Sequence, residues 1–328
     1  MKPFRYDRAA DIPAAVGTLA RERAGVFLAG GTNLVDLMKL GVMQPDLLVD
    51  VRRLTSAEIE DLPDGGLRIG AAVTNSELAA DRRIRSRYPA LSQALLSGGS
   101  GQLRNLATTG GNLLQRTRCA YFYDTTTPCN KREPGTGCSA LEGCNKDHAI
   151  FGASRHCVAT NPSDMVVAMT ALDAVVRIQG PGGERAIPVT ELHRLPGQEP
   201  ERDTTLEHAE LITAVDLPPS EFSSNSGYRK ARERASYAFA LVSVATALQV
   251  RGGLVRDVRI ALGGVAHKPW RAHTAEDALR GAPATEESFR EAAEAELADA
   301  APLPDNGYKV PLARNLMMRA LLDLSGGS

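Results

Sequence analysis

The sequence predicts an α+β protein built from two unequal domains, and three observations support this prediction. The length of 328 residues suggests about two domains. Short apolar strands and capped helices follow one another irregularly until a Ser/Asn-rich stretch at residues 220–227, which we interpret as the boundary. Beyond it, two apolar runs flank Arg251-Gly252-Gly253, a pattern typical of a β-hairpin. We therefore expect domains at residues 1–222 and 223–328, the second with an antiparallel sheet and helices.

Composition and charge exclude several classes of function. The chain is 43% hydrophobic and 23% charged, as in soluble globular proteins, and its net charge of −1 gives no support for nucleic-acid binding. No apolar run approaches the length of a membrane span, and the first residues contain no signal-peptide core. We expect no membrane span, and a location in the cytoplasm or, by co-export with a partner that carries a signal, in the periplasm.

Local signals predict the elements of the first domain. Asp11 precedes Ile12-Pro13 as a helix cap, and Thr74-Asn75-Ser76-Glu77 has the spacing of a capping box. Ser163 is suited to cap the helix that follows it. The sequence thus predicts helices after these caps and at 34–40 and 89–96, and strands at 26–29, 47–51, 67–71, 174–178, 184–188 and 211–217.

In the second domain the sequence predicts strands at 237–250 and 255–262 and helices at 274–280, 286–297 and 312–324. The helix at 286–297 is mostly alanine and glutamate, which indicates a solvated cover. The last helix carries a stripe of leucine and methionine side chains, which indicates packing against the core.

Two glycine-rich loops are candidates for phosphate binding. Gly30-Gly31-Thr32-Asn33 lies between a predicted strand and a predicted helix, where backbone N–H groups and the helix dipole attract phosphate. It does not match the dinucleotide fingerprint G-x-G-x-x-G. Residues 99–112 form a second loop, in which Gly110 and Gly111 allow close approach and Thr108, Thr109 and Asn112 supply hydrogen bonds. Taken singly, each loop is also compatible with a simple tight turn.

All five cysteines of the chain fall within residues 119–157, namely Cys119, Cys129, Cys138, Cys144 and Cys157. Prolines and glycines between them predict irregular backbone. A chain of this length can build its own core without disulfides, and the close Cys-x-x-Cys pair usual for zinc is missing. Four thiolates gathered by a loop suit an iron–sulfur cluster. Free buried thiols are the alternative, and so are ligands from His148 or His156, which flank cysteines.

Several motifs in order resemble the FAD-binding medium subunit of the xanthine dehydrogenase family. Residues 28–34 (LAGGTNL) and 107–113 (ATTGGNL) resemble its two flavin-binding loops. Residues 161–164 (NPSD), the region from Tyr228 to Phe239, and residues 261–266 (ALGGVA) resemble its later elements. The resemblance covers nearly the whole chain. It implies a two-part FAD-binding domain of the PCMH/vanillyl-alcohol-oxidase type, followed by a C-terminal domain of the CO dehydrogenase flavoprotein type.

The resemblance also implies which residues contact FAD. By position these are Leu28, Ala29, Gly30, Gly31, Thr32, Asn33, Leu34, Thr108, Gly111, Asn112, Leu114, Asp164, Leu211, Ile212 and Lys230. Without the resemblance, Asp164 reads as a helix cap, and Lys230 and Arg234 belong to a charge-rich run that is typical of a solvated face.

The cysteine-rich insertion, at about residues 115–160, resembles the branch of the family with an extra 4Fe–4S cluster, which includes bacterial periplasmic aldehyde oxidoreductases. Segments 118–122, 128–132 and 134–138 and the pair His156-Cys157 carry this likeness. It implies a 4Fe–4S cluster held by Cys119, Cys129, Cys138 and Cys157, with Cys144 left out because another residue is usual at its position.

The function implied is electron transfer in a heterotrimeric molybdenum hydroxylase that oxidises aldehydes to carboxylic acids. The partners would be a molybdenum-cofactor large subunit and a small subunit with two 2Fe–2S clusters, whose electrons pass through FAD to an external acceptor. No catalytic side chain of the chain's own stands out. Two alternatives remain: a non-enzymatic, zinc-stabilised scaffold, and a stand-alone flavin reductase of the same fold superfamily.

Overall fold

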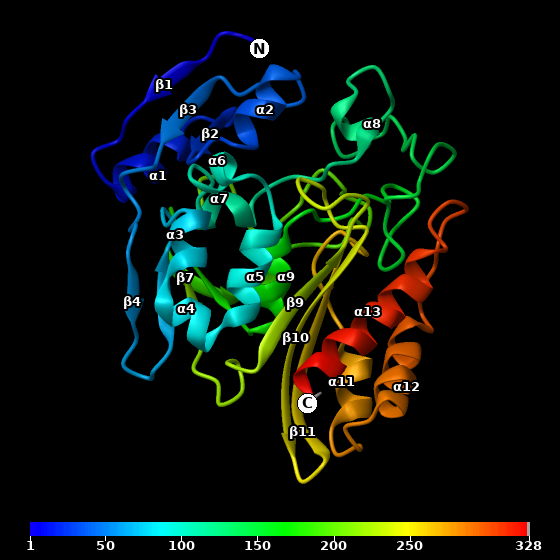
Figure 1. The fold of residues 1–328 in the computed structure, drawn as a ribbon. Coiled ribbons are helices and arrows are strands. Elements are labelled where there is room, and N and C mark those ends of the chain that lie inside the picture. The colour runs from blue at the N-terminus through cyan, green and yellow to red at the C-terminus, as the bar shows by residue number, and fades with distance from the viewer. Residues whose placement is uncertain (327–328) are drawn as a thin grey trace.

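The computed structural model describes residues 1–326 and contains a small parallel sheet at the N-terminus (Figure 1). Its strands, in the order β1-β3-β2, are β1 (Arg5–Asp7), β3 (Leu47–Asp50) and β2 (Gly25–Leu28), and its helices are α1 (Ile12–Ala20) and α2 (Leu34–Lys39). Asp11 caps α1 as expected, because its side chain accepts the Ala14 N–H at 2.8 Å. Apolar residues of α1 and β3 form this layer's own core.

An antiparallel sheet of five strands forms the second layer of the larger, N-terminal part. In sheet order the strands are β4 (Ile59–Asp61), β5 (Leu67–Gly70), β8 (Leu211–Leu217), β6 (Val175–Gly180) and β7 (Gly183–Pro188). Its helices are α3 (Asn75–Ala80), α4 (Arg82–Arg87), α5 (Pro89–Ser97), α6 (Gly101–Arg104), α7 (Thr109–Leu113), α9 (Asp164–Ala171) and α10 (Val189–Leu192). The capping box of Thr74 and Glu77 and the Ser163 cap are confirmed.

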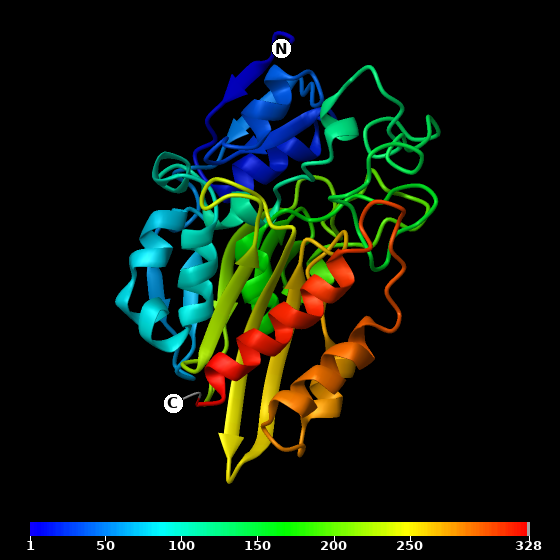
Figure 2. The same cartoon turned by 45° about the vertical axis from the view of Figure 1, so that its right-hand side comes forward.

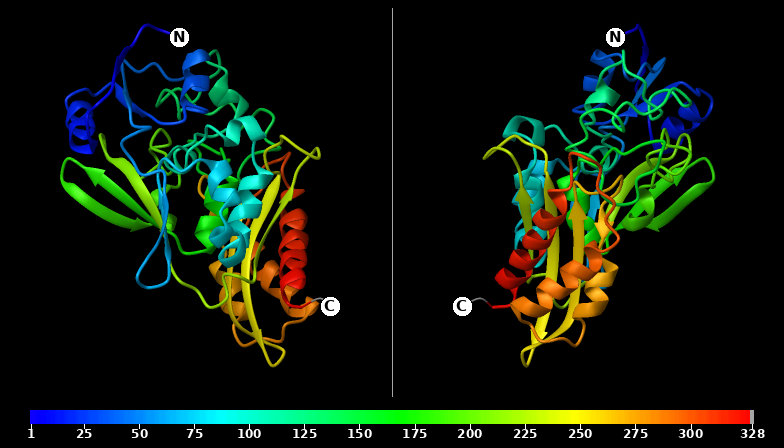
Figure 3. Two further views of the ribbon diagram at one scale, coloured as in Figure 1. Left: turned by 60° about the vertical axis from the view of Figure 1, so that its left-hand side comes forward. Right: turned by 90° about the vertical axis from the view of Figure 1, so that its right-hand side faces the viewer.

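A second antiparallel sheet, in the order β12-β11-β10-β9, forms the C-terminal part. Its strands are β9 (Ser226–Ala231), β10 (Val242–Arg251), β11 (Leu254–Gly263) and β12 (Trp270–Arg271). The hairpin predicted at Arg251-Gly252-Gly253 is confirmed. Helices α11 (His273–Leu279), α12 (Glu286–Leu297) and α13 (Lys309–Leu324) cover one face of this sheet (Figures 2 and 3).

The two faces of this sheet bury different cores. Ala245 and Ala261 join the core beneath the five-stranded sheet, together with α5 and α9. Val244 and Leu262, their neighbours along the strands, point into the core under α11–α13. Because successive side chains of a strand alternate between faces, one sheet serves both cores and holds the two parts together.

Several local predictions were wrong. The strand expected from residue 237 begins at Val242, since Tyr237 has a positive φ of 52° and lies in a loop. The charge-rich run at 229–234 is a solvated face only in part: its first three residues belong to strand β9 and the Lys230 side chain is buried, whereas Arg229 and Arg234 are exposed. Helix α12 is not merely a solvated cover, because residues such as Phe289 and Leu297 are buried. Helix α13 starts at Lys309, before the predicted residue 312, with a proline tolerated in its first turn.

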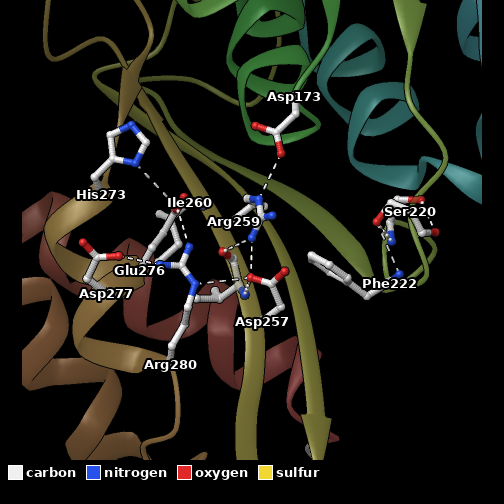
Figure 4. Close-up of polar contacts among 12 residues, drawn as sticks. Asp173, Ser220, Phe222, Asp257, Arg259, Ile260, His273, Glu276, Asp277 and Arg280 are labelled. Carbon is white, nitrogen blue, oxygen red and sulfur yellow. Dashed lines mark hydrogen bonds and ion pairs between the residues drawn. The ribbon is translucent and has the colours of Figure 1, made fainter.

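A polar network ties α11 and β11 to the end of α9 (Figure 4). The buried carboxylate of Glu276 accepts the Ile260 N–H at 2.7 Å and also pairs with Arg271. On the same strand, the Arg259 guanidinium pairs with Asp173, 2.9 Å away, just beyond α9. These contacts fix the position of α11 relative to α9. Among residues 1–326, no helix is both long enough and apolar enough to cross a membrane.

Candidate functional site

A cavity of about 790 Å³ opens where the parallel sheet meets the five-stranded sheet. The loop from Gly30 to Asn33, which joins β2 to α2, lines one side, and α7 with its preceding residues lines the other. The two backbones touch: a Cβ at Gly30 would collide with the carbonyl oxygen of Leu106. Only glycine allows this approach, so the two glycine-rich loops form one site.

The second loop is fixed by bonds to the five-stranded sheet and its neighbours. The N–H groups of Thr109 and Gly110 donate to the carbonyl oxygens of Val73 and Ala71, at 2.9 and 3.0 Å. The Thr108 hydroxyl accepts the N–H of Gly111, 3.3 Å away, as the cap of α7. Short local bonds therefore present the glycine backbone to the cavity.

The start of α9 contributes to the same site. The Ser163 hydroxyl donates to Asn112 Oδ1 at 2.7 Å and also accepts the Val166 N–H as the cap of α9. This side chain joins α7 to α9, which places the next residue, Asp164, at the cavity.

A buried charged pair lies in the cavity wall. Lys230 Nζ lies 2.8 Å from Asp164 Oδ2, and the Tyr228 hydroxyl donates to Asp164 Oδ1 at 2.5 Å. Burial raises the pKa of Asp164, although Lys230 and Tyr228 partly oppose the rise. Burial and the neighbouring Asp164 also raise the pKa of Tyr228 well above its ordinary value. The reading of Asp164 as a simple helix cap was incomplete, because its carboxylate pairs with strand β9.

The structure brings nearly all the residues that the resemblance implies for FAD to this one cavity. They are Ala29, Gly30, Gly31, Thr32, Asn33, Leu34, Thr108, Gly111, Asn112, Leu114, Asp164, Leu211, Ile212 and Lys230. Leu28 is the exception: it ends β2, its carbonyl accepts the Val51 N–H, and it is not among the residues that line the cavity. Their individual contacts with FAD stay predictions.

The sequence analysis did not identify several other side chains of this cavity. Arg104 and Arg118 bring positive charge to the wall, and Tyr237 and Phe239 lie at it while remaining half exposed. The Arg118 guanidinium stacks on the Phe239 ring, with 5.1 Å between its carbon and the ring centroid. They come from separate loops. Arg118 lies in the segment 118–122, and Tyr237 and Phe239 lie in the region 228–239; both carry the resemblance, but it did not assign these side chains to the cavity.

All five cysteines belong to the long irregular segment that contains α8 (Ala120–Tyr123), which Figure 1 shows. All five are free thiols. Cys129 and Cys138 are partners in an antiparallel β-bridge, and the thiols of Cys138 and Cys157 are hydrogen-bonded. Cys119 interacts electrostatically with Cys129 and Cys138. Cys144, by contrast, is exposed.

Burial raises the pKa of Cys119 to about 11. The hydrogen bond between Cys138 and Cys157 lowers the pKa of Cys138 to about 6 and raises that of Cys157, since one thiol donates to the other. Within residues 1–326, no three His, Cys, Asp or Glu side chains are arranged around one point so as to hold a single metal ion. The structure thus gives contacts between pairs of the predicted ligands but no assembled metal site among the described residues. The metal itself remains a prediction.

Two buried histidines contact these cysteines. His148 Nε2 lies 3.2 Å from Cys119 Sγ, and His267 Nε2 lies 3.2 Å from Cys157 Sγ. His156, the other histidine that flanks a cysteine, instead accepts a hydrogen bond from Arg155. His267 was not considered from the sequence, because it lies in the C-terminal domain, 110 residues beyond Cys157.

Comparison with known proteins agrees with this geometry. Residues 2–220 match the FAD binding domain in molybdopterin dehydrogenase, and residues 226–324 match the CO dehydrogenase flavoprotein C-terminal domain. The chain is 50% identical over 326 residues to the aldehyde oxidoreductase FAD-binding subunit PaoB of Escherichia coli, and the match covers 98% of both chains.

Solved structures share the fold. Quinoline 2-oxidoreductase from Pseudomonas putida superimposes with a TM-score of 0.76 at 25% identity, over 100% of this chain and 99% of that one. Reconstituted CO dehydrogenase from Oligotropha carboxidovorans gives a TM-score of 0.78 at 23% identity with the same coverage. The predicted fold class is thereby confirmed. With two family matches across its length and a half-identical relative, the chain belongs to the FAD-binding medium subunits of the molybdenum hydroxylase family.

Proposed function

We propose that this chain is the FAD-carrying electron-transfer subunit of a molybdenum hydroxylase that oxidises aldehydes to carboxylic acids. The observation that carries the proposal is the meeting of two glycine loops at one large cavity, in a chain half identical to an aldehyde oxidoreductase FAD-binding subunit. The alternative of a non-enzymatic scaffold required the glycine-rich loops to be simple turns. Membership of an oxidoreductase family argues against it.

The residues present fit FAD. Gly30 lets the two loops meet at the cavity, and the left-handed φ of 74° at Gly31 disfavours any other residue, so the backbone of this loop could approach a pyrophosphate closely. Thr108, Gly111, Asn112 and Asp164 would hold the phosphate, ribityl and adenosine parts, and Leu211, Ile212 and Lys230 would lie along the ring system. When bound, FAD accepts electrons and releases them to an acceptor. The protein's part is to hold the ring in place and to set its surroundings.

The partners follow from this function. We infer a small subunit with 2Fe–2S clusters as electron donor, a large subunit with the molybdenum cofactor as the site of aldehyde oxidation, and an external electron acceptor. A subunit without a substrate site of its own needs both companions. Export in complex with a partner that carries a signal would place it in the periplasm, and otherwise it would stay in the cytoplasm; fractionation of cells distinguishes the two.

We propose further that Cys119, Cys129, Cys138 and Cys157 hold a 4Fe–4S cluster and that Cys144 does not. Each iron of such a cluster takes one thiolate, so its ligands surround a volume rather than a point. All five thiols are free, and Cys129 and Cys138 are brought together by a β-bridge, which supports a site with several thiolate ligands. When bound, the cluster stores or relays an electron and orders the surrounding segment.

The visible spectrum, iron content and companions of the natively purified protein test these proposals. We expect flavin absorption with a broad iron–sulfur contribution, and about four irons beyond those of the small subunit. We also expect two partners to co-purify, one larger and one smaller than this chain. A colourless, zinc-containing protein would refute both cofactors. A chain that is purified alone and reduces an acceptor without partners would instead support the stand-alone reductase.

A further inference from the structure

We propose that His267 donates an Nε2–H hydrogen bond to the Cys157 sulfur and thereby raises the reduction potential of the cluster. This inference rests on the 4Fe–4S site proposed above. His267 Nε2 lies 3.2 Å from Cys157 Sγ, and both side chains are buried. The histidine belongs to the C-terminal domain, so a residue outside the cysteine-rich insertion would set a property of the cluster inside it.

The backbone just before His267 is bonded to chain segments on either side of Cys157. The carbonyl oxygen of Val265 accepts the N–H groups of Ile150 and Phe151, at 2.8 and 3.0 Å. The carbonyl oxygen of Ala266, the next residue, accepts the N–H of Asn161 at 2.9 Å. These three bonds bracket Cys157 in sequence, so they fix the distance between the imidazole and the sulfur.

The direction of the hydrogen bond follows from the chemistry of the acceptor. A thiolate bound to iron carries no proton, so a nitrogen in contact with it can only be the donor. Among residues 1–326, the other ring nitrogen, Nδ1, has no hydrogen-bond partner. His267 also lines a small polar cavity of about 20 Å³, which is large enough for one water molecule. With no protein acceptor at Nδ1 among the described residues, the single ring proton is available to Nε2, where the sulfur lies.

His148 stands in the same relation to Cys119 as His267 does to Cys157. Its Nε2 lies 3.2 Å from Cys119 Sγ, and its Nδ1 also has no hydrogen-bond partner among residues 1–326. Of the two histidines, His267 lines the small polar cavity described above, and the inference is limited to it.

A donor aimed at a cluster ligand has a predictable effect. Reduction adds negative charge, which is shared by the thiolate sulfurs, and a hydrogen bond to sulfur stabilises that charge. Loss of the bond should therefore lower the midpoint potential of the cluster without removing any ligand. A purely structural histidine would not move the potential in a loaded cluster.

The test is an EPR-monitored redox titration of the intact complex. His267→Leu should keep its iron but show a lower cluster midpoint potential, whereas His267→Gln, whose amide nitrogen can still donate, should stay close to the parent value. His156→Leu is the matched control, because this histidine also adjoins Cys157 but makes its side-chain contact with Arg155. Its potential should not change.

The possible outcomes separate the two proposals. If the unmutated complex does not contain the additional irons, the proposed 4Fe–4S site itself is refuted. With iron present, equal potentials in His267→Leu and the parent would overturn the role of His267. If His267→Leu loses its cluster, ENDOR spectroscopy of the reduced parent complex, grown with ¹⁵N-labelled histidine, decides the question. A ¹⁵N coupling that disappears in His267→Gln supports the hydrogen bond, and the absence of such a coupling contradicts it.

Discussion

The ammonium group of Lys230 and the carboxylate of Asp164 lie 2.8 Å apart at the wall of the cavity, although 66 residues separate them. Only 3% of the Lys230 side chain and 9% of the Asp164 side chain are exposed. The pair connects strand β9 of the C-terminal sheet to the start of α9. The same contact thus shapes the proposed FAD site and joins the two parts of the chain.

Lys230→Met should destabilise the protein by about 3 kcal/mol, because it leaves the Asp164 carboxylate buried and unpaired. FAD should be lost in parallel, since both residues line the cavity. Lys146→Met is the control: Lys146 pairs with Glu233 at the same 2.8 Å, but the pair is exposed, and its loss should cost less than about 1 kcal/mol. Denaturant unfolding and flavin content measure both effects, and equal losses in the two variants would contradict this assignment.

Gly111→Val should abolish FAD retention while leaving the fold intact. A Cβ at this position would lie 3.0 Å from Thr108 Oγ1 and 3.8 Å from the Ala29 Cβ, so valine would fill the space between the two loops. Gly101→Val is a suitable control, since a Cβ at Gly101 meets no atom within 4 Å. Flavin absorbance and circular dichroism are the measurements. Full FAD content in Gly111→Val would show that the loops do not hold the cofactor as proposed.

The five single Cys→Ser variants should divide into two classes. Iron content and the low-temperature EPR signal should survive in Cys144→Ser, because this thiol is exposed, whereas the other four cysteines lie together. Each of the other four variants should lose the cluster or show an altered one. A normal cluster in Cys119→Ser or Cys157→Ser, combined with its loss in Cys144→Ser, would require a different ligand set.

Because Lys309 is buried, we predict that the free energy of unfolding rises with pH. Burial lowers the pKa of Lys309 from 10.5 to about 8, and its Nζ donates to the carbonyl oxygens of His148 and Gly264, at 2.9 and 2.7 Å. Between these two pKa values the unfolded chain binds more protons than the folded chain, so the free energy of unfolding should increase from pH 8 towards 10.5.

The increase attributable to Lys309 is at most about 1.4 kcal/mol per pH unit. It appears as the difference in slope between the parent protein and Lys309→Met, measured by denaturant unfolding at several pH values. Parallel slopes would mean that Lys309 titrates normally in the folded protein.

The sequence alone determined those local features of the fold in which the decisive contact joins residues that are close together along the chain. The Thr74–Glu77 capping box, the Ser163 cap and the hairpin at Arg251-Gly252-Gly253 formed as predicted, since each needs only residues a few positions apart. The order of the glycine loops and the gathering of the cysteines in one segment were equally visible, because each motif is continuous in sequence.

Only the tertiary structure decided the rest. The first half of the charge-rich run at 229–234 joins strand β9 because β10 offers it a partner and Asp164 pairs with Lys230, two contacts that no local pattern encodes. Residue 237 was left out of the strand because the chain turns there with a positive φ. The approach of His267 to Cys157 depends on backbone bonds between distant segments. Contacts across such separations arise from packing of the whole chain, so periodicity and spacing could not reveal them.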